Sequence, residues 1–96
     1  MLKESKTAEY KAEYAESLKK TVVAFANTDG GDLYIGIRDD GTVAGLPSPE
    51  ATLLQVTNAI RDSVRPDVTM FVESSIYSIE GRDIVRVTVQ RGTARP

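Results

Sequence analysis

Acidic residues occur in two places from which they could converge on a metal ion. Glu4 and Glu9 lie five positions apart near the N-terminus, and Asp39 and Asp40 occupy a turn further along the chain. If the N-terminal segment pairs as a strand beside the strand that precedes this turn, the two groups of carboxylates meet. Carboxylate oxygens bind divalent cations such as Mg²⁺ or Mn²⁺, which assist phosphodiester cleavage. Taken alone, the residues favour the simpler interpretation: a routine Asp-Asp-Gly turn and solvated glutamates.

Basic residues form a second group that could have a binding function. Cationic side chains contact phosphates, and arginine does so with two parallel hydrogen bonds. The net charge of the chain is −2, so a nucleic-acid surface would have to be a local patch. The candidate phosphate contacts are Lys11, Lys19, Lys20, Arg38, Arg82 and Arg86. The competing interpretation is scattered solubilising charge. The exposed aromatic candidates for base stacking are few: Tyr10, Tyr14, Tyr34 and Tyr77.

The glycines Gly30, Gly31 and Gly36 resemble a phosphate-binding loop only in number. Phosphate loops place their glycines between a strand and the N-terminus of the following helix, where free N–H groups converge. Here the glycines follow a helical pattern and precede a strand, so they face the wrong helix end for an anion. No Gly-Lys-Ser/Thr follows them. The cluster predicts a structural turn, with no bound nucleotide cofactor.

Composition narrows the remaining chemistry. The 96 residues suffice for one domain with one core, and 1–96 is expected to be that domain. Histidine and cysteine are both absent, which excludes Ser-His-Asp triads, thiol nucleophiles and His or Cys metal sites. The apolar runs are too short to span a membrane, and the first residues lack a signal-peptide core. Together with the missing cysteines, this leads us to expect a cytoplasmic location.

Apolar spacing and turn residues predict the elements. They are, in chain order, a short strand over 8–11, a helix over 14–27, a strand over 33–38, a short strand over 42–45, a helix from Pro49 to 65, and two strands joined at Glu80-Gly81. Ser48 is the expected N-cap of the second helix, and the residue before Pro66 ends it. Leu33, Ile35 and Ile37 are expected on one face of their strand. The order β-α-β-(β)-α-β-β predicts an α/β sandwich (α+β) whose two helices lie on one face of a mixed sheet.

Several motifs also carry a family likeness. They are Glu4-Ser5 with Glu9-Tyr10-Lys11, the run from Lys20 to Gly31 that contains Ala-Phe-Ala-Asn-Thr-Asp-Gly-Gly, and Tyr34-Ile35-Gly36-Ile37 followed by Asp39-Asp40-Gly41. In these motifs and in its last strand, the chain resembles the Schlafen AlbA-type domain, also labelled divergent AAA. The resemblance implies an Alba-like nucleic-acid-binding module at the N-terminus of a longer prokaryotic protein. By the same resemblance, such proteins are expected to be transcriptional regulators or helicase-related, ATP-binding proteins.

In the Schlafen branch, carboxylates on this scaffold cleave structured RNA, and the resemblance places the first two of them at Glu4 and Glu9. The third stands directly after the Ile-Gly-Ile strand, where this chain has Arg38. Asp39 is one position further, and a shift of one residue along a strand turns a side chain to the other face. This departure argues against nuclease activity and leaves binding unaffected. The missing phosphate loop argues against ATP binding.

The sequence therefore predicts a non-enzymatic nucleic-acid-binding domain that prefers DNA to RNA and uses the six basic residues as phosphate contacts. One alternative is an endoribonuclease that uses Glu4, Glu9 and Asp39 with Mg²⁺ or Mn²⁺. Another is an interaction module that forms a homodimer and positions other domains. No membrane partner is expected.

Overall fold

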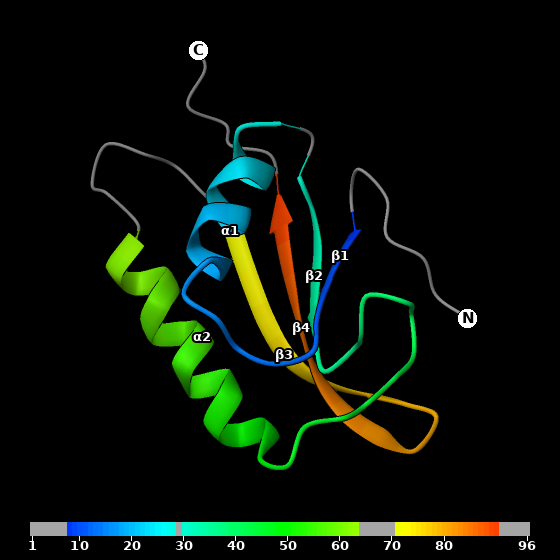
Figure 1. Cartoon of the computed structure of the whole chain (residues 1–96). Helices are drawn as coiled ribbons and strands as arrows, with labels where there is room; N and C mark the ends of the chain where they lie inside the picture. Colours follow the sequence, from blue (N-terminus) through cyan, green and yellow to red (C-terminus); the bar gives the residue numbers. More distant parts are fainter. Residues whose placement is uncertain (1–7, 29, 64–70, 91–96) are drawn as a thin grey trace.

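The computed structural model of the chain describes residues 8–28, 30–63 and 71–90. Its elements are β1 (Ala8–Lys11), α1 (Leu18–Ala26), β2 (Gly31–Ile35), α2 (Pro49–Ser63), β3 (Phe71–Ile79) and β4 (Arg82–Gln90) (Figure 1). The four strands form one sheet in the order β1-β2-β4-β3. β1 runs parallel to β2, whereas β2–β4 and β4–β3 are antiparallel. The predicted α+β architecture with a mixed sheet is confirmed.

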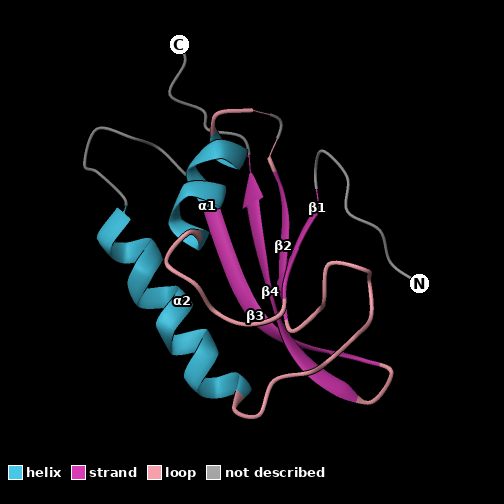
Figure 2. Cartoon of the chain, viewed as in Figure 1, coloured by secondary structure: helices cyan, strands magenta, loops and turns pink. Residues whose placement is uncertain are grey.

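Both helices lie on the same face of the sheet, as predicted (Figure 2). The core between the two layers is built by alternate residues of the central strands, because successive side chains of a strand point to opposite faces. Leu33 and Ile35 of β2 face the helices, as do Val85, Val87 and Val89 of β4. The helices contribute Leu18, Val22, Phe25, Ala26 and Val56. These side chains are nearly all fully buried, so this core holds the helices to the sheet.

The predicted strand over 33–38 is wrong at its end. β2 finishes at Ile35, because Gly36 adopts a φ of +113°, which breaks the extended backbone. Ile37 therefore does not share the face of Leu33 and Ile35, as the alternation had predicted. It packs instead with Tyr10, Val43 and Ile84 in a second cluster on the opposite side of the sheet.

The predicted short strand over 42–45 is reduced to an isolated bridge between Ile37 and Val43. Hydrogen bonds also hold this loop together, among them those from Arg38 N to Thr42 O (2.9 Å) and from Ala44 N to Gly36 O (2.8 Å). The loop over 36–46 thus returns on itself beside the end of β2 and covers part of the sheet face away from the helices. In the chain order of the elements, this loop takes the place of the predicted short strand over 42–45.

The first helix begins at Leu18 and not at residue 14, because the chain needs 12–17 to cross from the end of β1 to the helix layer. Tyr14 still packs against the main core. The other end agrees with the prediction: Asn27 is the C-cap. Gly30, with a φ of +85°, donates its N–H to Phe25 O at 2.9 Å. Only Gly30 of the glycine pair has a positive φ, since Gly31 already belongs to β2.

The second helix and the last hairpin form as predicted. α2 begins at Pro49, and Thr52 N donates to Ser48 O at 3.1 Å. Its predicted end at 65 lies outside the described residues. Glu80 and Gly81 both have positive φ values (55° and 76°) between paired Ile79 and Arg82, as in a two-residue type I′ turn.

Candidate nucleic-acid interface

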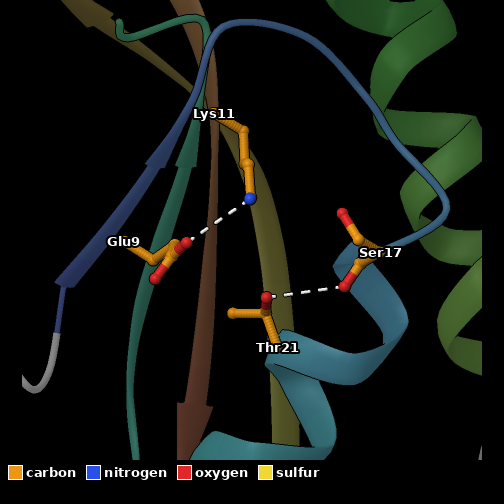
Figure 3. Close-up of polar contacts among 4 residues, drawn as sticks. All are labelled: Glu9, Lys11, Ser17 and Thr21. Carbon is orange, nitrogen blue, oxygen red and sulfur yellow. Dashed lines mark hydrogen bonds and ion pairs between the residues drawn. The ribbon is translucent and has the colours of Figure 1, made fainter. Parts of the chain in front are cut away.

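Two of the predicted site residues, Glu9 and Lys11, lie side by side on β1. The buried ring of Tyr10 points to the sheet face away from the helices, so Glu9 and Lys11 point to the helix face. Figure 3 shows both side chains on the side of β1 that faces the start of α1, near Ser17 and Thr21. Lys11 Nζ lies 3.4 Å from Glu9 Oε2, and both side chains are partly exposed. This exposed ion pair is weak, so it compensates the charge of Glu9 only in part.

The helix α1 carries two further predicted cations. Lys19 forms an i, i+3 ion pair with Glu16 at 3.6 Å. Lys20 is exposed and forms no ion pair with the described residues. Among the described residues, the β1–α1 side therefore presents Lys11, Lys19 and Lys20, and of these Lys20 alone forms no ion pair.

The turn after β2 holds Arg38, Asp39 and Asp40, all exposed. Gly41 N donates to Arg38 O at 2.8 Å, and Asp40 Oδ1 accepts the Thr42 N–H at 2.9 Å. The hydrogen bond from Thr42 N–H stabilises the ionised carboxylate and lowers the pKa of Asp40, and the positive charge of Arg38 acts in the same direction. Asp40 therefore orders the turn that presents Arg38.

The three carboxylates of the nuclease hypothesis are not shown together. Glu4 lies outside the described residues, Glu9 is paired with Lys11, and Asp39 stands in the exposed turn. No group of three acidic side chains within 8–28, 30–63 and 71–90 is arranged to hold a metal ion. Glu9 and Asp39 remain predicted ligands of Mg²⁺ or Mn²⁺ only.

The last two predicted phosphate contacts, Arg82 and Arg86, are on β4. They lie on the sheet face away from the helices, which we call the open face. It carries Asp32 and Tyr34 of β2, Tyr77 of β3, and Arg86 and Thr88 of β4. Arg82 begins β4 and is exposed, with its Cβ packed against Gly45. Arg86 is half-buried: one guanidinium nitrogen lies 3.4 Å from Asp32 Oδ1, which also accepts a hydrogen bond from Thr88 Oγ1 at 2.8 Å.

The six predicted phosphate contacts thus do not form one patch. Lys11, Lys19 and Lys20 lie on the helix side of the molecule, whereas Arg82 and Arg86 lie on the open face. Arg38 belongs to the loop over 36–46, which packs against the start of β4 near Arg82. The predicted contacts therefore fall into two groups separated by the sheet.

Sequence reasoning missed the part that Asp32 and Thr88 have on the open face. The alternation of side chains along β2 could have identified Asp32, because it puts Asp32 on the same face as Tyr34. The register that sets these two residues beside Thr88 and Arg86 is a tertiary property. Among the aromatic candidates, Tyr34 and Tyr77 do lie on the open face, and Tyr77 is 46% exposed. Tyr10 is buried against Ile37 and Ile84, so its predicted exposure is wrong.

Comparison with family models places this geometry in a known context. The Schlafen AlbA_2 family model matches residues 4–96. The chain belongs to the Schlafen AlbA_2 family, as its motifs suggested, and this membership associates the domain with nucleic acids. A comparison with curated proteins found no significant match. In the described part of the chain, neither helix is long and apolar enough to cross a membrane.

Proposed function

We propose that this chain is the DNA-binding domain of a longer prokaryotic protein, either a transcriptional regulator or a helicase-related protein. The family supports association with nucleic acids. The observation that carries the proposal is the state of three of the predicted contacts: Lys20, Arg38 and Arg82 are exposed and, like Arg61 on α2, form no ion pair within the described residues. In a chain of net charge −2, predicted contacts in this state can bind phosphates without first breaking an ion pair.

Binding at these surfaces would be electrostatic and independent of sequence. A cation that neutralises a phosphate releases a condensed counterion from DNA, which is the main source of affinity in non-specific binding. Lys11 and Lys19 contribute by exchanging an exposed glutamate partner for a phosphate, a small cost because exposed ion pairs are weak. Phosphate contacts of this kind set orientation and leave sequence unread.

The test is a salt titration in which fluorescence anisotropy measures the binding of duplex DNA. The logarithm of the association constant should fall linearly with the logarithm of the salt concentration, by about 0.9 for each phosphate contact. Parallel titrations with single strands and RNA of the same length rank the ligands. Flat salt dependence, or no binding at low salt, would overturn the proposal.

Two observations keep the alternative functions in view. Glu9, whose side chain is 38% exposed at the edge of the sheet, is accessible to a metal ion and therefore favours the endoribonuclease. The outer edge of β3 has no strand partner among the described residues, and a free edge of nine residues favours an interaction module. Sedimentation at several concentrations tests the module, and a monomer that still binds DNA would exclude dimerisation as its main role.

A further inference from the structure

Part of the open face is not covered by any of the described residues. The loop over 36–46 covers one end of this face through Ile37 and Val43, which pack on Tyr10 and Ile84. The helices cover the other face of the sheet (Figure 2). Between these coverings, Tyr34, Arg86 and Tyr77 lie on three neighbouring strands, with no described helix or loop packed over the Tyr77 ring.

The guanidinium of Arg86 lies between two aromatic rings. Tyr34 is the direct register partner of Arg86 on β2, and Arg86 Cζ is 6.0 Å from the centroid of its ring. On the other side, Tyr77 of β3 has its centroid 5.6 Å from the same carbon. Both distances are within the range of cation–π attraction. Tyr10 meets Tyr34 edge to face, with centroids 5.7 Å apart and planes at 70°, which fixes the Tyr34 ring.

The charge of this arrangement favours a base over a phosphate. Asp32 lies 3.4 Å from Arg86 and compensates its positive charge, so the site has little net attraction for an anion. What it offers is π-surface, from the rings of Tyr34 and Tyr77 on either side of the Arg86 guanidinium. Flat aromatic surface beside a planar cation suits an unpaired base, since every base has a π-face.

We infer that the open face binds single-stranded nucleic acid by stacking an unpaired base on the Tyr77 ring. Tyr77, Arg86 and Tyr34 form a row of stacked side chains across β3, β4 and β2, which we call the ladder. The inference rests on the proposed nucleic-acid function and deepens it by naming a ligand class that the phosphate contacts alone do not select. Tyr77 is the outermost and most exposed ring of the ladder, at 46%, so it receives the base. In a duplex the bases are already stacked, so duplex DNA gains nothing from this ring.

The experiment measures binding of the 96-residue chain to labelled oligonucleotides of about 20 units, a length above the site size of single-strand binders. The probes are oligo-dT, oligo-rU and a mixed-sequence duplex. Tyr77→Ala should weaken single-strand binding by about 5- to 100-fold, the usual effect of losing one base–aromatic stack. Duplex affinity should change less than about twofold, and the salt dependence should be retained because stacking releases no counterions.

Three variants separate stacking from folding. Tyr77→Phe keeps the ring and should bind single strands like the parent. Tyr77→Leu keeps apolar bulk without a π-face and should lose binding like Tyr77→Ala, even if the alanine variant proves unstable. Leu54→Ala removes a large side chain that is 61% exposed on α2 and should have no effect.

The outcomes are distinct. If the parent binds oligonucleotides in a salt-dependent way and both Tyr77→Leu and Tyr77→Ala bind single strands equally well, the stacking site is excluded and the proposed function stands. If the parent binds nothing at low salt, the proposed function fails, and the stacking site fails with it. If only single strands bind and Tyr77→Leu abolishes this, the stacking site stands and the duplex-binding proposal fails. The comparison of oligo-dT with oligo-rU decides between DNA and RNA.

Discussion

A Cβ atom on Gly36 would lie 2.8 Å from Cγ2 of Ile84, closer than non-bonded carbon atoms approach in proteins. Gly36 also has a φ of +113°, a backbone conformation that side chains disfavour. This contact joins the end of β2 to the start of β4. We expect Gly36→Ala to lower the free energy of unfolding by about 3 kcal/mol or more, from backbone strain and overpacking combined. Urea unfolding followed by circular dichroism measures the loss.

The matched control is Gly81→Ala. Gly81 has a similar positive φ of +76°, but a Cβ atom there would meet nothing within 4 Å. The substitution should cost only the conformational part, about 1–2 kcal/mol. Equal losses for the two variants would show that contact with Ile84 is not what requires glycine at residue 36.

The turn that presents Arg38 should respond to pH through Asp40. The pKa of Asp40 is lowered in the folded state from its usual 3.8, mainly by the Thr42 N–H. The unfolded chain therefore binds this proton more readily, and the stabilisation is fully present above 3.8 and lost as the pH falls through the folded pKa. Asp40→Asn, which keeps an oxygen acceptor for Thr42, should be less stable than the parent near neutral pH. The difference should vanish in acid, when urea unfolding is repeated below the folded pKa.

The companion variant Asp40→Ala removes the acceptor as well as the charge. It should remain less stable than the parent in acid, because the protonated carboxyl of the parent still accepts from Thr42. A difference between parent and Asp40→Asn that stayed constant with pH would contradict the assigned cause of the pKa shift.

Phosphate contacts should be visible in the salt dependence of duplex binding. Arg38→Gln and Lys20→Gln, made separately, should each weaken binding across all sequences and lower the magnitude of the log–log salt slope by about 1. Arg61→Gln on α2 removes the same charge from an exposed residue outside the proposed contacts. If Arg61→Gln lowers the slope as much as Arg38→Gln, only net charge matters, and the assignment of contacts is wrong.

The nuclease alternative makes a contrasting prediction. If Glu9 binds a catalytic metal, incubation with structured RNA and Mn²⁺ should give cleavage that Glu9→Gln reduces by at least about 100-fold, a loss on the scale of removing a catalytic group. We expect no cleavage by the parent, because Arg38 occupies the position at which the family resemblance implies a third carboxylate. Cleavage that Glu9→Gln leaves unchanged would come from a contaminant.

Some of these features could be predicted from the sequence because their causes are local. The alternation of Val85, Val87 and Val89 defined a buried strand face, and Glu80-Gly81 defined a two-residue turn. The helix that ends at Asn27 followed from apolar spacing and from glycine just beyond it. The family motif, Ala24 to Gly31, is formed from these same local signals. In each case, a few neighbouring residues set the backbone conformation.

The tertiary structure decided what depends on residues far apart in the chain. The residues near Gly36 did not predict that the strand ends there, since glycine is also tolerated inside strands. The close approach of Ile84 and the reversal of the loop over 36–46 set the end of the strand. The ladder of Tyr34, Arg86 and Tyr77 depends on the register of three strands, which a shift of one residue would destroy. The sequence by itself thus determined the order and type of the main elements and the family, through short-range conformational preference. Only long-range pairing decided which charges and rings share a surface, because side chains about 50 residues apart meet only once the sheet has formed.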